Sequence, residues 1–107
     1  MVRQMSVQEL KTELDTTKKQ PFILDVREPW ECQICALPNS INIPMGQIPA
    51  RLGELDPDQE IIVLCHHGIR SYQVCNFLQS NGFDNLYNLK GGIDAWSKEI
   101  DPAMQTY

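Results

Sequence analysis

Short apolar runs alternate with segments of helical periodicity along the whole chain. Runs containing Ile, Val or Leu occur at residues 22–26, 41–43, 60–64 and 85–89. Continuous short runs are typical of strands buried on both faces of a parallel sheet, and alternating runs are typical of strands with one covered face. We therefore predict strands at these places and a short edge strand at 3–5.

Helical periodicity fills much of the sequence between these runs. Ser6 and Glu9 have the spacing of a capping box at the start of a first helix. The segment 70–82 carries apolar residues at i, i+3 and i+4 and ends in glycine, which predicts another helix. Shorter helices are predicted near Pro29, a residue acceptable at a helix start, and over 49–55.

The order of these elements indicates the fold class. Strands that alternate with helices predict an α/β fold with a mainly parallel sheet between helices, a three-layer sandwich. A chain of 107 residues is long enough for one buried core and too short for two, so we predict a single domain over 1–107. The polar segment 15–21 is expected to be a surface connection, and the tail 101–107 is expected to be loosely held.

Composition argues against several classes of partner. The formal net charge is −5, and 9 basic against 14 acidic residues leave no Lys/Arg cluster to neutralise phosphates, so nucleic-acid binding is not expected. No apolar run is long enough to span a bilayer, and residues 1–6 lack the apolar core of a signal peptide. We therefore expect a cytoplasmic protein without membrane contact. Its four cysteines are then expected to be reduced.

The candidate chemistry lies at Cys65, where the run 60–64 gives way to a polar loop that contains Gly68. A strand end, a tight loop and a helix N-terminus are predicted to meet there. Unpaired backbone N–H groups and the positive end of the helix dipole would then point into the loop. A thiol in that setting is predicted to act as a nucleophile. The alternative is a buried cysteine that only contributes to packing.

Four motifs in order resemble those of the rhodanese sulfurtransferases, most of all the small single-domain members. They are Leu24-Asp25-Val26-Arg27-Glu28, Ile41-Asn42-Ile43-Pro44, Cys65-His66-His67-Gly68-Ile69-Arg70-Ser71 and Gly91-Gly92-Ile93-Asp94-Ala95-Trp96. Together they span nearly the whole chain. The resemblance implies a five-stranded parallel sheet with helices on both faces, a Cys65 that cycles between thiolate and persulfide, and no cofactor.

The implied reaction moves sulfane sulfur from thiosulfate or a low-molecular-weight persulfide to cyanide, a thiol or a protein. Cys65 is the expected catalytic residue of a two-step covalent cycle. Loop amides and the helix dipole would stabilise the persulfide, Gly68 would let the loop curl, and Arg70 would recognise an anionic donor. Ser71 would cap the helix or face the loop. The expected substrate- and persulfide-binding loop comprises His66, His67, Gly68, Ile69, Arg70 and Ser71.

An alternative function uses the same loop without rapid turnover. The chain would then be a persulfide carrier, or a sulfur-sensing docking module, for a partner protein. The physiological donor and acceptor are not specified by the sequence, and an intact loop around Cys65 is compatible with both functions.

Loop length separates sulfur chemistry from phosphate chemistry. Related phosphatases on the same fold carry a loop one residue longer between cysteine and arginine, and the smaller loop between Cys65 and Arg70 favours a sulfur atom. His66 and His67 are adjacent on a tight loop with no spaced second ligand pair, so no metal site is predicted. Both imidazoles are expected at the pocket mouth, where thiosulfate turnover should rise as pH falls through the histidine range.

Three residues outside the loop are candidates for supporting roles. Asp25 and Arg27 match the strand-end motif of the family, and we interpret them as a structural ion pair near the site. Trp30 either shields the pocket mouth or packs against the fold.

The other cysteines are interpreted as structural. Cys32 and Cys35 have redox-motif spacing but do not follow a predicted strand directly, so packing is favoured. Cys75 is expected in the core beside a helix, although a sulfur relay or a protective disulfide with Cys65 stays open.

Overall fold

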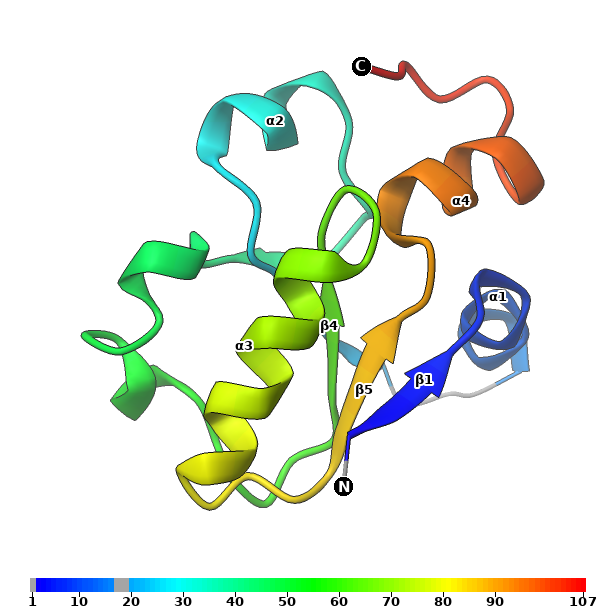
Figure 1. The fold of residues 1–107 in the computed structure, drawn as a ribbon. Helices are drawn as coiled ribbons and strands as arrows, with labels where there is room; N and C mark the ends of the chain where they lie inside the picture. The colour runs from blue at the N-terminus through cyan, green and yellow to red at the C-terminus, as the bar shows by residue number, and fades with distance from the viewer. Residues whose placement is uncertain (1, 17–19) are drawn as a thin grey trace.

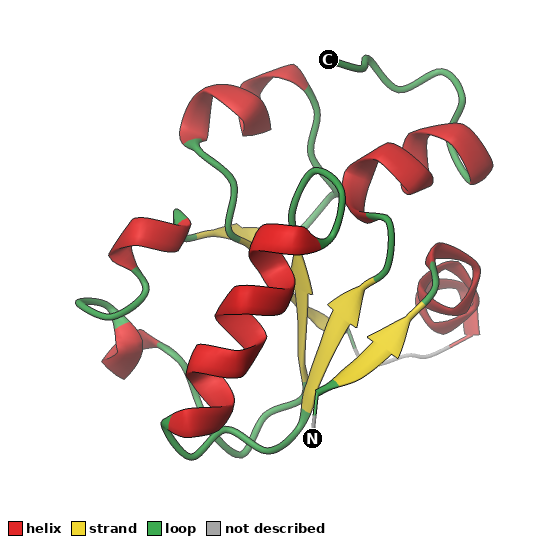
Figure 2. Cartoon of the chain, viewed as in Figure 1, coloured by secondary structure: helices red, strands yellow, loops and turns green. Residues whose placement is uncertain are grey.

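The computed structural model describes residues 2–16 and 20–107, in which a parallel sheet lies between helical layers (Figures 1 and 2). The five strands formed by these residues are β1 (Arg3–Met5), β2 (Phe22–Asp25), β3 (Ile41–Asn42), β4 (Ile61–Leu64) and β5 (Leu86–Leu89). Their order in the sheet is β1-β5-β4-β2-β3, and each neighbouring pair is parallel. The predicted α/β class and five-stranded parallel sheet are confirmed.

Helices cover both faces of the sheet. On one face α1 (Val7–Thr16) and α4 (Gly92–Glu99) pack together, and on the other face α3 (Ile69–Ser80) packs against β4 and β5 (Figure 1). The short helix α2 (Pro29–Ile34) lies beyond the carboxyl ends of the strands. Parallel strands end at one edge, so the segments after β2, β4 and β5 meet there. No helix of the described residues is long and apolar enough to cross a bilayer.

The core consists of two apolar clusters separated by the sheet. In β4, Ile61 and Val63 belong to the cluster under α3, whereas Ile62 and Leu64 belong to the cluster under α1 and α4. This division follows from the two-residue period of side chains along a strand. All four residues are buried, as expected for a central strand covered on both faces.

The predicted start of the first helix is confirmed in detail. Glu9 N–H donates to Ser6 Oγ at 3.0 Å, and Ser6 N–H donates to Glu9 Oε1 at 2.9 Å, which completes the capping box. The helix continues through Thr16, so it includes the first part of the surface connection predicted at 15–21. Residues 17–19 of that connection lie outside the described residues.

The prediction of a helix over 49–55 is wrong. This part of the chain instead contains two 3-10 helices, η1 (Met45–Gln47) and η2 (Leu52–Glu54). Pro49 has no N–H to donate, and Gly53 has low helix propensity, so neither supports a continuous α-helix. The apolar residues of the segment nevertheless pack into the cluster under α3.

The tail 101–107 was predicted to be loosely held, but in the structure it contacts distant segments of the chain. The Tyr107 hydroxyl donates to Glu31 Oε1 at 2.8 Å and accepts a hydrogen bond from Arg27 Nη1 at 3.0 Å. Its ring stacks on His66 with 4.0 Å between centroids. Met104 packs against the cluster under α1 and α4. Contacts with distant segments therefore hold a tail that lacks a local pattern of its own.

Helix α4 approaches the loop after β4 at a distance that only glycine allows. Gly92 has φ 61°, and a Cβ there would lie 2.4 Å from the carbonyl oxygen of Cys65 and 2.5 Å from that of His66. The approach lets Ile93 N–H donate to the Cys65 carbonyl (2.9 Å) and Asp94 N–H donate to the His66 carbonyl (3.0 Å). Backbone hydrogen bonds therefore fix the loop to α4.

Replacing Gly92 with alanine should lower the free energy of unfolding by about 2–4 kcal/mol, because the new Cβ would push α4 from the loop and strain a positive φ. Gly53→Ala is a matched control, since a Cβ at Gly53 meets no atom within 4 Å. It should change stability by less than about 1 kcal/mol. Urea unfolding measures both variants, and equal stabilities would contradict the proposed steric requirement.

Candidate active site

Cys65 lies directly after β4, at the carboxyl edge of the sheet, and is 1% exposed. Gly68 N–H donates to its Sγ at 3.0 Å, and Ser71 Oγ lies 3.2 Å from the same atom. Helix α3 begins at the next residue after Gly68, so its N-terminal end also faces this region. The strand end, tight loop and helix start that the sequence predicts around Cys65 do meet there.

Gly68 makes the tight loop possible. Its φ of 102° lies in the left-handed region, where a side chain is strained. A Cβ at this position would also lie 3.2 Å from Gly91 N and 3.4 Å from the carbonyl oxygen of Leu89. Both the turn and the neighbouring backbone therefore favour glycine at the point where the amide meets the sulfur.

A chain of polar groups continues from the sulfur into the sheet. Ser71 lies inside α3 and not at its N-cap, so the predicted capping role is wrong. Its hydroxyl instead donates to Asn88 Oδ1. Asn88 Nδ2 donates to the Gly68 carbonyl (3.1 Å) and to Gln4 Oε1 (3.0 Å), which fixes the amide orientation. The Ser71 oxygen can accept from the Cys65 thiol, and its hydroxyl can turn toward the sulfur after the thiol loses its proton.

The loop surrounds a depression of about 280 Å³ that opens beside the sulfur. The residues lining it are Cys65, His66, His67, Ile69 and Arg70. Gly68 and Ser71 contact Sγ from the loop and from α3. The structure therefore brings the predicted loop residues together around one site. Its volume is near the lower end of small-molecule sites, roughly 300–1,000 Å³.

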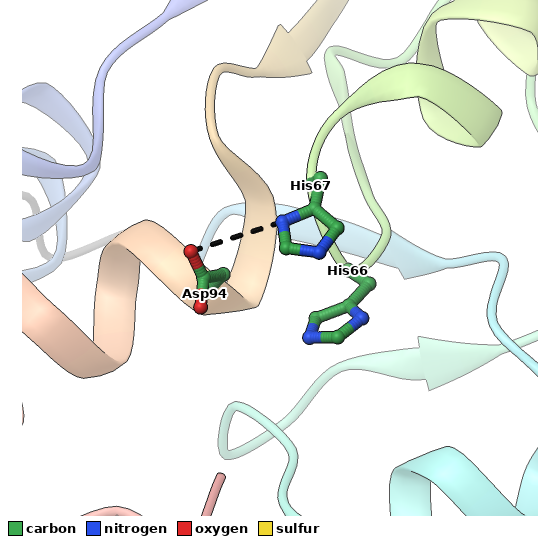
Figure 3. A group of neighbouring side chains, drawn as sticks. All are labelled: His66, His67 and Asp94. Atoms are coloured by element: carbon green, nitrogen blue, oxygen red, sulfur yellow. Dashed lines mark ion pairs between the residues drawn. The ribbon is translucent and has the colours of Figure 1, made fainter. Parts of the chain in front are cut away.

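The two histidines stack on each other at the mouth of the depression, with 4.0 Å between ring centroids and 26° between ring planes (Figure 3). Burial, together with the charge of His67, lowers the pKa of His66 below its ordinary value of 6.5. The His66 imidazole is therefore predominantly neutral at pH 7. Asp94 Oδ2 lies 3.7 Å from His67 Nδ1, at the first turn of α4.

His66, His67 and Asp94 are the residues here that could hold a metal ion, because their ligand atoms lie within 4.8 Å of one another. A metal ion lies in the plane of an imidazole that binds it, and two nearly parallel rings cannot share one ion without rotating. Lys98 Nζ also contacts Asp94 Oδ2 at 3.0 Å. Metal binding would therefore require this cluster to rearrange.

Arg70, the fixed positive charge of the loop, is paired with Glu31 of α2. Its Nη1 donates to Oε2 and its Nη2 donates to Oε1, both at 2.8 Å. The Glu31 side chain is only 5% exposed. The hydrogen bonds from Arg70 outweigh the effect of burial and lower the pKa of Glu31 to about 2. A guanidinium expected to face an anionic donor therefore already has a carboxylate partner.

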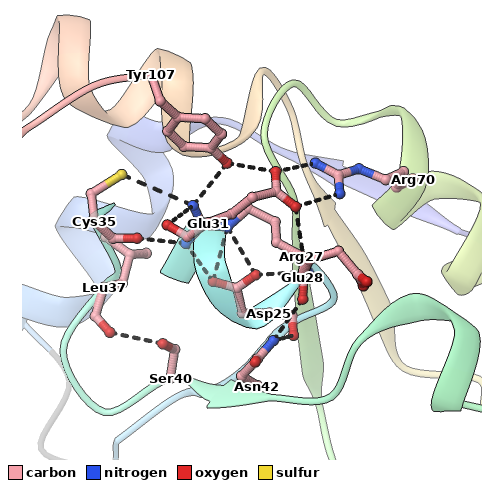
Figure 4. Close-up of polar contacts among 10 residues, drawn as sticks. All are labelled: Asp25, Arg27, Glu28, Glu31, Cys35, Leu37, Ser40, Asn42, Arg70 and Tyr107. Atoms are coloured by element: carbon pink, nitrogen blue, oxygen red, sulfur yellow. Dashed lines mark hydrogen bonds and ion pairs between the residues drawn. The ribbon is translucent and has the colours of Figure 1, made fainter. Parts of the chain in front are cut away.

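Asp25 and Arg27 form an ion pair that is excluded from solvent (Figure 4). Arg27 Nη2 donates to Asp25 Oδ2 at 2.7 Å, and Nε donates to Oδ1 at 3.0 Å. Arg27 also contacts Tyr107, which in turn contacts Glu31. Trp30 is 59% exposed and meets the Tyr107 ring edge-on at 5.9 Å. Neither Asp25 nor Arg27 lines the depression. Arg27 holds the segment that carries Glu31, because its Nη1 donates to the Glu31 carbonyl at 3.4 Å.

All four cysteines are free, and their surroundings differ. Burial raises the pKa of Cys75 to about 12 and the pKa of Cys32 to about 11, so both are thiols at pH 7 and poor nucleophiles. Cys35 Sγ accepts a long hydrogen bond from Arg27 Nη1 at 3.9 Å. Cys65 differs because an amide, a hydroxyl and a helix N-terminus surround its sulfur.

Four site residues were not found from the sequence. Glu31 stands three residues after Glu28, and Glu28 N–H donates to its Oε2. This spacing is that of a capping box at the start of α2, so the sequence held a signal for the position of Glu31. The signal for Asp94 was its position in the first helical turn after the glycine pair. Asn88 and Tyr107 carry no local pattern that predicts their contacts.

Comparison with known proteins matches most of the chain to one family. Residues 6–99 match the model of the rhodanese-like domain. A sulfurtransferase from Allochromatium vinosum is 34% identical over 104 residues, covering 97% of this chain and 96% of that protein. The crystal structure of a rhodanese-like domain protein from Staphylococcus aureus superposes with a TM-score of 0.85 at 34% identity, covering 92% of this chain and 94% of the other.

A longer relative shows the same domain within a larger protein. The rhodanese-like/PpiC domain-containing protein 12, chloroplastic, from Arabidopsis thaliana is 38% identical over 112 residues. The match covers 99% of this chain and 38% of that protein. The chain is thus similar both to whole small proteins and to one part of a larger one.

Glu31 should make the stability of the fold depend on pH in acid. The folded protein keeps this carboxylate ionised down to about pH 2, whereas the unfolded chain binds the proton near the ordinary pKa of 4.5. Its contribution is therefore complete above about pH 4.5 and is lost as pH falls toward 2, by about 2–3 kcal/mol.

Urea unfolding of the wild type and of Glu31→Gln measures this contribution. Their stability difference at pH 7 should shrink as pH falls toward 2, because protonation then removes the charge from a growing share of the wild-type carboxyl groups. Glu54→Gln is the control, because Glu54 forms an exposed pair with Arg51. A Glu31→Gln difference that is the same at both pH values would contradict the assignment.

Proposed function

This chain belongs to the rhodanese-like family, and from that premise we propose that it is a sulfurtransferase in which Cys65 carries the transferred sulfur. Sulfurtransferases among its relatives support sulfur transfer in general. The observation that carries the assignment to Cys65 is the environment of its Sγ, which lies 3.0 Å from Gly68 N and 3.2 Å from Ser71 Oγ at the start of α3. This environment can stabilise negative charge on sulfur.

The first half-reaction is a displacement at sulfane sulfur. The Cys65 thiolate attacks the outer sulfur of thiosulfate, a bond forms between Sγ and that sulfur, and the S–S bond of the donor breaks. Sulfite leaves with the electron pair, and the protein keeps Cys65–S–S⁻. A low-molecular-weight persulfide is the alternative donor, with a thiolate as the leaving group.

The second half-reaction returns the protein to its starting state. A nucleophilic acceptor attacks the outer sulfur of the persulfide, and the electron pair of the broken S–S bond returns to Sγ as thiolate. Cyanide would leave as thiocyanate, and a thiol would leave as a new persulfide. Both displacements balance without an added oxidant or reductant.

The surrounding residues have distinct roles in this proposal. Gly68 N–H and the N-terminus of α3 stabilise the anionic sulfur, and Ser71 hydrogen-bonds to Sγ. His66, His67, Ile69 and Arg70 line the mouth through which donor and acceptor enter. Asp25 and Arg27 position α2, while Trp30 supports the tail through Tyr107.

A second candidate function is a persulfide carrier for a partner protein. It is favoured by a relative from Bacillus subtilis that is named a putative sulfur carrier protein and is 30% identical over 100 residues. That match covers 94% of this chain and 54% of the relative. We propose a protein acceptor beside small thiols, and a cytoplasmic location, where four free cysteines would stay reduced.

Sulfur loading followed by turnover tests both functions. After incubation with thiosulfate or glutathione persulfide, intact-protein mass should rise by one sulfur atom, and the added sulfur should map to Cys65. Rapid thiocyanate formation with cyanide would support the enzyme, whereas loading with little turnover would support the carrier. Cys65→Ser should abolish loading, and Cys75→Ser should retain it. If Cys65 loads from neither donor, both functions are wrong.

The pH dependence of thiosulfate turnover tests the role of His66. Because its pKa lies below 6.5, positive charge on the His66 imidazole develops only in mildly acidic solution. The ratio of wild-type to His66→Ala kcat/KM should therefore rise by about 2–5-fold as pH falls below about 6.5. Using the ratio removes the effects of pH that the two proteins share. If this ratio does not change with pH, and the ratio of wild type to His67→Ala does not change either, an electrostatic role of the histidines is contradicted.

A further inference from the structure

The charge of Arg70 is cancelled by a carboxylate that is itself firmly held. Both oxygens of Glu31 accept hydrogen bonds from Arg70 at 2.8 Å. Glu28 N–H donates to Oε2 at 2.9 Å, and the Tyr107 hydroxyl donates to Oε1 at 2.8 Å. That hydroxyl accepts from Arg27 Nη1, so the network continues to the buried ion pair (Figure 4). The guanidinium of Arg70 is one half of a neutral, fixed pair.

The other ionisable groups near the mouth do not give it a net positive charge. Lys98 Nζ lies 3.0 Å from Asp94 Oδ2, and His67 Nδ1 lies 3.7 Å from the same oxygen. The lowered pKa of His66 keeps its imidazole predominantly neutral at pH 7. Arg70, the Arg in the lining of the depression, therefore has a carboxylate partner, and so does Lys98 beside His67.

We infer that Glu31 sets the donor preference of the site, which favours an organic persulfide over thiosulfate. The inference rests on the proposed sulfur transfer through Cys65. Thiosulfate carries two negative charges, and its sulfonate end needs net positive charge at the mouth. The Arg70–Glu31 pair presents N–H groups there without net charge. A persulfide has no sulfonate, and its organic part can contact Ile69, which is 70% exposed and lines the depression.

Sulfur transfer from a persulfide to Cys65 needs no oxidant or reductant besides the two reactants. The Cys65 thiolate attacks the outer sulfur of R–S–SH, a new S–S bond forms at Sγ, and the donor S–S bond breaks. Its electron pair leaves on R–S⁻, while the proton stays on the transferred sulfur. The product Cys65–S–SH then ionises beside Gly68 N–H.

The test compares second-order rate constants for loading Cys65 from glutathione persulfide and from thiosulfate, measured by quenched-flow mass spectrometry. The two donors differ in intrinsic reactivity, so the decisive quantity is how their ratio changes in a variant. Glu31→Gln keeps an amide oxygen for Tyr107 but removes the charge that cancels Arg70. It should raise the thiosulfate constant about 10-fold, change the persulfide constant by less than about 3-fold, and make thiosulfate loading fall with added salt.

Two further variants separate charge from structure. Glu31→Gln combined with Arg70→Gln restores an uncharged pair, so the donor ratio should return to within about 3-fold of the wild-type ratio. Glu54→Gln removes the same charge from an exposed pair with Arg51, and neither residue lines the depression. It should leave the donor ratio unchanged.

The outcomes distinguish the inference from the proposed function. A donor ratio that is unchanged in Glu31→Gln overturns the inference. If that variant does not fold, the wild-type salt dependence decides: thiosulfate loading that is flat or rises with salt supports a neutral mouth, and a steep fall overturns it. Failure of Cys65 to load from either donor overturns the proposed function instead.

Discussion

The buried ion pair between Asp25 and Arg27 is the interaction on which the geometry of the site depends. Both side chains are excluded from solvent, so their charges must be satisfied inside the protein. Arg27 donates to Asp25, to the carbonyl of Cys35 at 2.8 Å and to the hydroxyl of Tyr107. It thereby joins the end of β2, the end of α2 and the tail. Removing one partner would leave an uncompensated charge, and removing Arg27 would also remove its hydrogen bonds with all three segments.

The sulfur site is held from two sides by different means. On one side the close approach at Gly92 lets backbone amides of α4 donate to the carbonyls of Cys65 and His66. On the other side α2 reaches the loop through the side chains of Glu31 and Arg70. The first contact fixes the backbone, and the second determines the charge at the mouth. A change at Glu31 or Arg70 can thus alter the preference for donors and leave the amide environment of the sulfur unchanged.

The sequence was sufficient to predict those parts of the structure that follow from a local pattern of residues. The buried residues of β4 form one apolar run, and the polar loop after it locates Cys65 at a strand end. The hydrogen bonds of Glu31 with Arg70 and Tyr107 instead span 39 and 76 residues, and no periodicity relates such positions. The helix expected over 49–55 failed because proline and glycine weaken continuous helical hydrogen bonding. Local patterns therefore predicted most of the elements and the position of Cys65 at a strand end, whereas tertiary polar contacts determined the electrostatics.

Burial of Cys65 also limits how an acceptor can reach the sulfur. The residue is 1% exposed, so in the proposed reaction an acceptor would meet the outer sulfur of the persulfide, one S–S bond of about 2 Å from Sγ. The depression of about 280 Å³ admits a small thiol or an extended segment more readily than a folded surface. A protein acceptor, if the proposed carrier function holds, would therefore have to present its nucleophile on a flexible end. Enzyme and carrier would share the same loaded Cys65 and differ in how readily the acceptor enters the depression.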